Sequence, residues 1–199
     1  MYLNEIISRA ELDLKDLIAV YCYGSRVYGT FNNESDYDFI IITTNKTQEQ
    51  FSDNLININF FTPEEHQARL ETHEISAIEC QFVSSEFILL EKRKFKFKLD
   101  KSKLRYSLSA KSSNSWVKAK KKLTVEDSYN LNVGRKSLFH SFRIIDFGIQ
   151  LANNGKIDFT SCNSLYKEII KHYEWSDMFE SFKQRYNEKC SEFKSIAHK

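Results

Sequence analysis

The stretch YCYGSRVYGTFNNESDYDFIII, residues 21–42, carries the strongest structural signal in the sequence. It begins as an apolar run, breaks at Gly24-Ser25, crosses a polar loop, and becomes apolar again directly after Asp36 and Asp38. Short apolar runs bounded by turn residues are typical of buried strands, so we expect two strands joined by this loop. Two carboxylates at the start of a strand that enters the core need an explanation, because unpaired buried charge is costly.

Asp36 and Asp38 are two residues apart, and side chains at that spacing on a strand point to the same face. At about 3.3 Å of rise per residue, their Cβ atoms would lie roughly 6–7 Å apart. Carboxylates this close repel each other unless a cation lies between them. Mg²⁺ prefers oxygen ligands of this kind and also binds substrate phosphates. The simpler alternative is that both aspartates only cap a turn.

The break at Gly24-Ser25 has the composition of a phosphate-binding turn. Glycine lets a phosphate approach the backbone closely, and N–H groups at the start of a helix or turn can bind it. Ser25 adds a hydroxyl, and Arg26 adds a guanidinium suited to phosphate oxygens. Alternatively, Gly-Ser is only a turn and Arg26 only a surface charge. The turn and the carboxylate pair together are a more specific signal than either alone.

The elements around this motif follow from local patterns. Apolar residues at helical spacing between Leu3 and Leu17 predict an opening helix, and strands are expected at 17–23, 38–43 and 55–61. Thr62-Pro63-Glu64-Glu65 supplies an N-cap, a proline at the first helical position and a capping-box glutamate. A helix is therefore expected from this point to about His73.

Period-two alternation over 75–83, with Ile78 and Cys80 on one side and Ala77 and Glu79 on the other, predicts a fourth strand. Beyond Ser84 the pattern is helical throughout. The helices expected there are 126–152, ended by Asn153-Asn154-Gly155, then 164–173, and then 177–196, where Asp177 and Glu180 have capping-box spacing.

These elements predict an α+β fold, with a small mixed sheet and flanking helices followed by a helical C-terminal half. We expect a core over residues 1–90, with a basic segment and helical bundle at 91–199 packed on it. The 199 residues suffice for a sizeable core. No apolar run approaches the length of a membrane span, and MYLNEIISRAEL lacks the features of a signal peptide. No membrane contact is therefore expected.

The cysteines are far apart in the sequence and form no CxxC pair: Cys22, Cys80, Cys162 and Cys190. This spacing favours free thiols over a zinc site, and free thiols are typical of a reducing cytoplasm. We therefore expect a cytoplasmic protein (in the host cytoplasm if a phage encodes it).

The motif resembles the signature of the DNA polymerase β-type nucleotidyltransferase superfamily: an apolar strand, Gly-Ser, a spacer, and Asp-x-Asp leading into a strand. The fuller string GSRVYGT…SDYD is similar to one branch, the small predicted nucleotidyltransferases of bacteria and phages, some of them associated with RNA ligases. ININFFTPEEHQARLETHEISAIECQFV is similar to that branch in layout, and RKSLFHSFR resembles its helical part. The resemblance covers most of residues 17–152 and is most specific at 21–42.

The resemblance implies that Gly24 and Ser25 hold the phosphates of an NTP, with Arg26 beside them. It also implies that Asp36 and Asp38 are the catalytic carboxylates and bind Mg²⁺, with Mn²⁺ as an alternative ion. In two-metal catalysis such ions stabilise the attacking and the leaving oxygens.

The superfamily usually adds a third acid on the next strand. Here the matching positions are Asn57 and Asn59, which are neutral. Glu79 is the nearest replacement as a catalytic acid. The alternative is that Glu79 is an ordinary surface glutamate or an ion-pair partner.

The charge of the chain is uneven, because residues 92–122 hold 13 Lys or Arg and one acid, Asp100. Aromatic residues lie among these charges: Phe95, Phe97, Tyr106 and Trp116. Basic residues among aromatics suit single-stranded nucleic acid, so RNA is the expected partner. The alternative is that the rings belong to the core and the charges form a solvated face.

On the long helix, Lys136, His140 and Arg143 lie at i, i+4 and i+7, which is one face. They are expected to contact the nucleotide. The function expected is Mg²⁺-dependent transfer of a nucleoside monophosphate from an NTP to an acceptor hydroxyl, at an RNA end. The alternatives are a catalytically weak or inactive nucleotide- or RNA-binding module, and a transferase acting on a protein or a small molecule. The sequence leaves the preferred NTP and the oligomeric state open.

Overall fold

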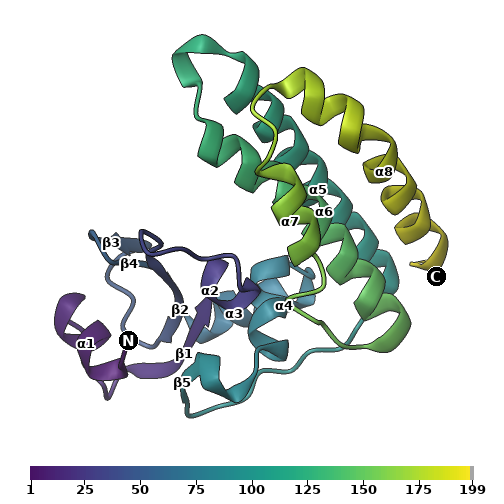
Figure 1. Cartoon of the computed structure of the whole chain (residues 1–199). Coiled ribbons are helices and arrows are strands. Elements are labelled where there is room, and N and C mark those ends of the chain that lie inside the picture. Colours follow the sequence, from purple (N-terminus) through teal and green to yellow (C-terminus); the bar gives the residue numbers. More distant parts are fainter. Residues whose placement is uncertain (198–199) are drawn as a thin grey trace. The chain divides into compact units, whose positions relative to one another are not determined.

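A mixed five-stranded sheet organises the first half of the computed structural model, which describes residues 1–197 (Figure 1). Its strands are β1 (Leu17–Tyr23), β2 (Tyr37–Thr43), β3 (Gln50–Ser52), β4 (Ile56–Phe61) and β5 (Ile88–Glu91). The chain divides into two compact units, of which the first is Met1–Lys98 and the second begins at Leu99. The α+β fold expected from the sequence, with a helical second half, is confirmed. Within residues 1–197, no helix combines the length and the apolar character that a membrane crossing requires.

The strands are ordered β3-β4-β2-β1-β5, and β2 pairs with β4 in parallel, whereas the other neighbours are antiparallel. The central strand β2 carries the apolar run Ile40–Ile42, all of it buried. The register places Asp38 of β2 between Tyr23 of β1 and Asn57 of β4. Asp38 therefore lies at the end of a buried strand with a polar neighbour on each side.

Helices flank the sheet in the first unit: α1 (Leu3–Arg9), α2 (Ser25–Tyr28), α3 (Pro63–Glu71) and α4 (Ile75–Phe82). The capping box predicted for α3 is present. The Glu65 N–H donates to Thr62 Oγ1 at 3.2 Å, and the Thr62 N–H donates to Glu65 Oε2 at 2.8 Å. These two bonds satisfy backbone donors at the helix start, so α3 begins where the sequence indicates.

The strand predicted over 75–83 is wrong, because this segment forms α4. The alternation was misleading: Ala77 and Glu79, assigned to the polar side, are as deeply buried as Ile78 and Cys80. His73, at φ 59°, ends α3 with a left-handed turn, so a second helix follows the first almost directly. A segment buried on several sides loses the simple pattern that separates a helix from a strand.

Two strands were not expected. The sequence predicts only helix beyond Ser84, but β5 pairs antiparallel with β1 at one edge of the sheet. At the other edge, β3 pairs with β4. Both are short, as is common for edge strands, and too short to show a periodic pattern.

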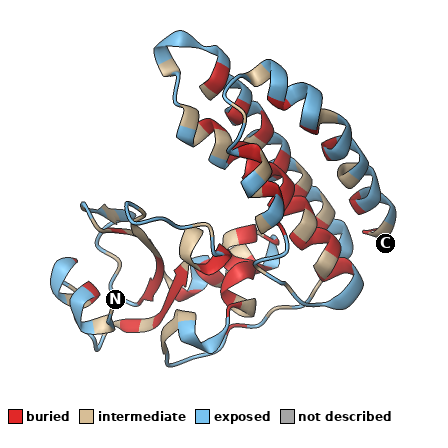
Figure 2. Cartoon of the chain, in the orientation of Figure 1, coloured by how far each residue is buried: buried red, intermediate tan, exposed pale blue. Residues whose placement is uncertain are grey.

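The second unit consists of α5 (Lys101–Thr124), α6 (Leu131–Asn154), α7 (Asn163–Ile169) and α8 (Trp175–Ile196). The long helix expected from residue 126 begins later, because the Asn130 side chain accepts from the Val133 N–H at 2.9 Å and caps α6 there. It ends at Gly155, as predicted, in the left-handed conformation. Helix α8 begins at Trp175, before the expected capping pair. Figure 2 shows the buried residues concentrated along α6, the central helix of this unit.

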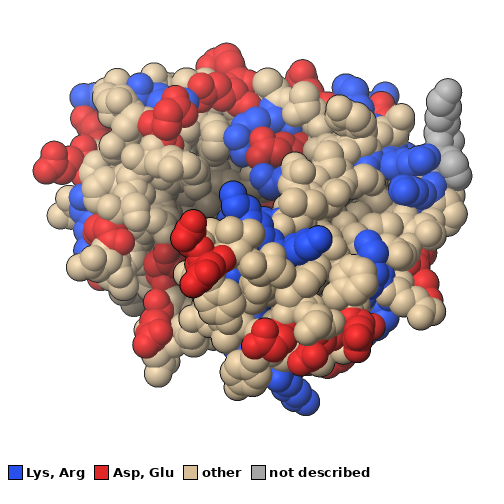
Figure 3. Space-filling model, turned by 90° about the horizontal axis from the view of Figure 1, so that it is seen from above, with Lys and Arg blue, Asp and Glu red and all other residues tan. Residues whose placement is uncertain are grey.

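The basic segment 92–122 is divided between a stretch without regular secondary structure and α5. On α5, one stripe is buried: Leu104, Leu108, Ser112, Trp116, Ala119 and Leu123. Trp116 stacks on Tyr186 at 4.5 Å between ring centroids and is therefore a core residue. Tyr106, in contrast, is 83% exposed. Figure 3 shows one face of the molecule, on which basic and acidic side chains both gather in separate groups.

Candidate active site

Four polar side chains lie on one face of the sheet. Tyr23, Asp38 and Asn57 are paired across β1, β2 and β4, and paired residues present their side chains to the same face. Asp36 lies two residues before Asp38 and therefore shares that face. The Asn57 amide donates a hydrogen bond to Oδ2 of Asp36. The structure therefore brings Asp36 and Asp38 to the same side, at the ends of β1, β2 and β4.

Gly24 lies directly against one of these carboxylates. Its φ of +78° favours glycine, and a Cβ atom at this position would be 2.1 Å from Asp38 Oδ2. The Gly24 carbonyl accepts from the N–H groups of Val27 and Tyr28, both at 3.1 Å, so α2 and its Ser25 follow at once. The turn after β1 and the carboxylate of β2 are thus in contact.

Arg26 holds the loop that connects the two halves of the motif. Its guanidinium donates to the backbone carbonyl of Ser35 at 2.7 Å and to that of Asp36 at 3.3 Å, and it lies 3.5 Å above the Tyr37 ring. The sequence assigns Arg26 to phosphate binding, but in the structure its guanidinium contacts two carbonyls and a ring instead. Sequence reasoning missed this role, since its partners are backbone groups that no residue pattern identifies.

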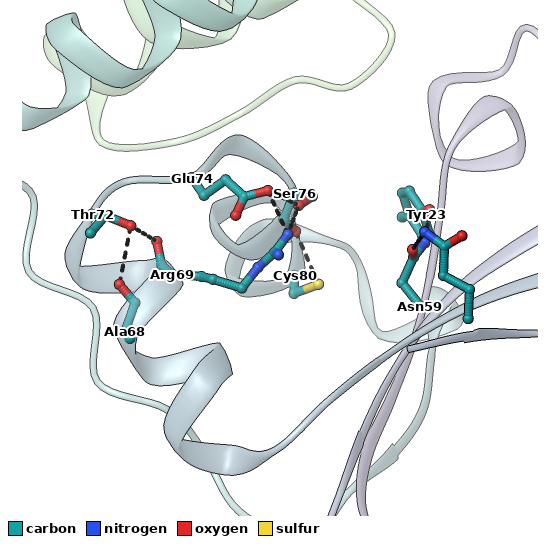
Figure 4. Close-up of polar contacts among 9 residues, drawn as sticks. Tyr23, Asn59, Ala68, Arg69, Thr72, Glu74, Ser76 and Cys80 are labelled. Carbon is teal, nitrogen blue, oxygen red and sulfur yellow. Dashed lines mark hydrogen bonds and ion pairs between the residues drawn. The ribbon is translucent and has the colours of Figure 1, made fainter. Parts of the chain in front are cut away.

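Asn57 and Asn59 are both held by the edge strand β3. The Ser52 hydroxyl donates to Asn57 Oδ1 at 2.5 Å, and the Gln50 amide donates to Asn59 Oδ1 at 3.0 Å. The Asn59 amide in turn donates to Tyr23 Oη at 2.6 Å (Figure 4). Both asparagines therefore offer N–H donors to the face that carries the carboxylates.

Glu79 is placed differently from the expectation. It lies on α4 rather than on a strand, is 2% exposed, and accepts a hydrogen bond from Tyr28 Oη at 2.8 Å. Glu79 is therefore not a surface glutamate, and it joins α4 to α2. Burial, together with the Asp38 and Glu79 carboxylates, raises the pKa of Tyr23, so its phenol is neutral at physiological pH.

The turn between α3 and α4 is fixed by Arg69, which lies 3.9 Å from the Phe61 ring of β4. Arg69 donates to Glu74 Oε1 at 2.5 Å and to the Ser76 hydroxyl at 2.9 Å (Figure 4). These contacts hold the start of α4 against the sheet. They explain how Glu79, one turn further along, is carried into the core.

Lys136, His140 and Arg143 lie on α6, in the second unit. Lys136 is exposed, whereas Arg143 is buried and its Nε donates to His140 Nδ1 at 3.2 Å. Burial lowers the pKa of His140 well below its usual range, and the nearby Arg143 and Lys136 lower it further. A histidine that accepts this bond is neutral, so the three residues do not act as three equal positive charges.

The carboxylate pair has the oxygen ligands that a divalent metal ion prefers. Within residues 1–197, no group of three or more His, Cys, Asp and Glu side chains is arranged to hold a metal ion. The chain would therefore supply Asp36 and Asp38 alone. This fits Mg²⁺, which is commonly held by one or two carboxylates and takes its remaining ligands from water and substrate phosphates.

A comparison with protein families agrees with this geometry. A family model described as a nucleotidyltransferase domain matches residues 3–108, more than half of the chain. A solved structure of a nucleotidyltransferase-like protein from Exiguobacterium sibiricum 255-15 is 11% identical, with a TM-score of 0.33, over 98% of this chain and 72% of that chain. No curated protein matches the chain.

Proposed function

The chain belongs to the nucleotidyltransferase domain family, and from this premise we propose that it transfers a nucleoside monophosphate from an NTP to a hydroxyl at an RNA end. Nucleotidyl transfer in general follows from the family. The ion, the nucleotide contacts and the acceptor are the proposed parts. We assign Mg²⁺, with Mn²⁺ as an alternative, to Asp36 and Asp38.

One observation carries the proposal: the Asp38 carboxylate lies against Gly24, on the face that Asp36 also shares. A carboxylate pair at this position suits a divalent cation, and the turn beside it suits the phosphates that the cation also binds. When bound, the ion would neutralise charge that develops on the transferred phosphoryl group.

The chain's own residues act mainly by position and charge. Asp36 and Asp38 would hold the ion, while Ser25 and the N–H groups at the start of α2 would contact the phosphates. The hydrogen bond from Tyr28 to Glu79 joins α2 to α4. We therefore assign Glu79 an indirect role, in which it helps to hold α2 in position. Lys136 is the most accessible of the three α6 residues for a phosphate contact.

RNA is proposed as the acceptor because of the exposed lysines of α5. They lie outside its buried stripe, on the exposed part of the helix: Lys101, Lys103, Lys111, Lys118, Lys120 and Lys121. A single strand offers a phosphate to each such charge and a base to an exposed ring such as Tyr106. A small acceptor offers too few phosphates for this number of lysines.

We also place the protein in the cytoplasm. All four cysteines are free thiols, and Cys22, Cys80 and Cys162 are buried. Such thiols are typical of reducing compartments.

The test incubates the protein with each labelled NTP, Mg²⁺ and cellular RNA, and then separates RNA, protein and small molecules. We expect label in RNA and its loss on chelation of the metal. Asp38→Asn should lower the rate at least about 100-fold, the scale at which removing one group that stabilises the transition state is felt. Glu34→Gln, which removes an exposed charge near the pair, is the matched control and should transfer normally. Label in protein or in a small molecule would exclude the RNA acceptor, and no turnover of any NTP would refute the proposal.

A further inference from the structure

The two asparagines of β4 are in register with two polar residues of β3. Asn57 pairs with Ser52, and Asn59 pairs with Gln50. In both pairs the β3 side chain donates to the asparagine Oδ1, at 2.5 Å from Ser52 and 3.0 Å from Gln50. Edge strand β3 thus holds the carbonyl end of each amide.

The amide nitrogens consequently point away from β3, toward β2 and β1. Asn57 Nδ2 donates to Asp36 Oδ2, and Asn59 Nδ2 donates to Tyr23 Oη. An ionised carboxylate can only accept hydrogen bonds, so Asn57 has to present its nitrogen to Asp36. Its oxygen then needs a donor on the other side, and the Ser52 hydroxyl is one.

We propose that Asn57 is a positioning residue for Asp36, and that Ser52 orients Asn57 for this task. The inference rests on the proposed function, because it concerns the carboxylate assigned to the metal ion. Asn57 binds Oδ2 of Asp36 and leaves Oδ1 for the ion. Outer groups that orient a metal ligand in this way commonly change metal affinity by 10- to 100-fold when they are removed.

The neutral side chain at position 57 explains why the carboxylate can be held before any ion binds. An aspartate there would repel Asp36 in the absence of a cation, whereas an amide donor attracts it. Arg26 holds the backbone of the same residue through the Asp36 carbonyl, at 3.3 Å. Asp36 is therefore fixed at its backbone by α2 and at its side chain by β4.

The chain also contains a matched control for the series of hydrogen bonds from Ser52 through Asn57 to Asp36. Gln50, Asn59 and Tyr23 form a parallel series of hydrogen bonds from the same edge strand, but this series ends on a phenol. Gln50 and Ser52 are both exposed, so replacing either should leave the core intact. A difference between the two variants therefore reports the link to Asp36.

The experiment measures Mn²⁺ binding to the full chain without nucleotide, by electron paramagnetic resonance. We expect Ser52→Ala and Asn57→Ala to weaken binding about 10-fold, Ser52→Thr to retain it, and Gln50→Ala to leave it unchanged. Equal affinity of Ser52→Ala and the unaltered chain would overturn the inference, and so would equal weakening by Gln50→Ala.

A second readout needs no metal. The side-chain amide protons of Asn57 should show slowed exchange in nuclear magnetic resonance spectra, and Ser52→Ala should abolish the slowing while Gln50→Ala preserves it. Fast exchange of these protons in the unaltered chain would contradict the proposed hydrogen bonds of Asn57. If the unaltered chain binds Mn²⁺ and transfers label but Ser52→Ala changes neither readout, only this inference fails. If it binds no Mn²⁺, the metal assignment fails as well.

Discussion

Gly24 has a backbone conformation and a neighbour that together exclude a side chain. Its φ is +78°, and Asp38 Oδ2 would lie 2.1 Å from a Cβ atom there. The same Asp38 carboxylate is assigned to the metal ion, so a side chain at position 24 would disturb both the packing and the proposed metal site. Gly155 also has a positive φ, of +64°, but nothing lies within 4 Å of its Cβ position.

We expect Gly24→Ala to displace the Asp38 carboxylate and to reduce nucleotidyl transfer at least about 100-fold, as for loss of a stabilising group. Gly155→Ala is the control for a glycine at positive φ: its left-handed conformation (φ 64°, ψ 22°) costs alanine about 1–2 kcal/mol, less than the conformation of Gly24 (φ 78°, ψ −155°), and it touches no carboxylate. Both variants should lower the free energy of unfolding in denaturant titrations, and only Gly24→Ala should lose activity. Normal transfer by Gly24→Ala would contradict the assignment of Asp38.

His66 is a second residue whose surroundings make a prediction. It is fully buried, stacks against Tyr21, and meets the edge of Phe95 at 4.7 Å between ring centroids. Burial first, and then the charge of Arg69, lower its pKa from 6.5 to about 4. Neither ring nitrogen has a hydrogen-bond partner within the described residues 1–197.

The unfolded chain therefore binds a proton at this histidine below pH 6.5, while the folded chain does not until about pH 4. Stability contributed by His66 is complete above pH 6.5 and falls as the pH decreases toward 4, by about 3 kcal/mol in total. His66→Phe should flatten this part of the stability–pH profile in urea titrations at several pH values. An unchanged slope between pH 4 and 6.5 would show that another group is responsible.

At the scale of elements, the contact between Tyr28 and Glu79 joins α2 to α4. Both side chains are buried, and the hydrogen bond between them is 2.8 Å long. Hydrogen bonds to charged groups contribute about 1.5–3 kcal/mol. The helix after the Gly-Ser turn therefore depends on a helix that the sequence pattern does not predict.

We expect Tyr28→Phe to destabilise the fold by about 1.5–3 kcal/mol and Glu79→Gln, whose amide oxygen still accepts from Tyr28, to destabilise it by less; the double variant should be less destabilised than the sum. Their effects on transfer should likewise be coupled and should fall on kcat, since both act on the position of α2. The measurement is a double-mutant cycle of unfolding free energies with matching kinetics. A loss of activity in Glu79→Gln that Tyr28→Phe does not share would instead indicate a direct role in catalysis.

The sequence predicts elements well where a local signal is complete. The Gly24 break defines β1 and β2, and Thr62, Pro63 and Glu65 define the start of α3. It fails for α4, where residues on both sides of the apparent alternation are buried. It also fails for β3 and β5, because pairing at a sheet edge depends on partners distant in the chain.

The candidate site divides in the same way. Period two alone predicts Asp36 and Asp38 on one face, and Asn57, which is in register with Asp38, donates to Asp36. The donor role of Asn57 depends on Ser52 of an unexpected strand, and the position of Arg26 depends on backbone carbonyls. Neither could be read from residue types, because each needs the tertiary pairing first.

At the scale of the whole chain, the carboxylate pair and the lysines belong to different units. Asp36 and Asp38 lie in the first unit, whereas most exposed lysines of the basic segment lie on α5 in the second. The family match ends at residue 108, inside α5, so most of this helix lies beyond it. The α5 lysines are therefore the natural place to test what distinguishes this chain's acceptor.

The last prediction concerns the salt dependence of RNA binding. Each phosphate contact on a single strand contributes a slope of about −0.7 to the logarithm of affinity against that of salt concentration. Replacing Lys120, Lys121 and Lys122 with alanine should flatten this slope by up to about two units if all three contact phosphates. Fluorescence anisotropy with a labelled single-stranded RNA at several salt concentrations measures it.

The control replaces three exposed lysines of the same unit that lie outside the basic segment, Lys156, Lys167 and Lys171. It removes the same charge, so a general field effect would flatten both slopes equally, whereas contact at the end of α5 would flatten only the first. Because lysines in the last turn of a helix also stabilise it by about 0.3–1 kcal/mol each, the melting temperatures of both variants are compared first. Unchanged binding by the α5 variant would show that the lysines are a solvated face, and the acceptor would then be sought among proteins and small molecules.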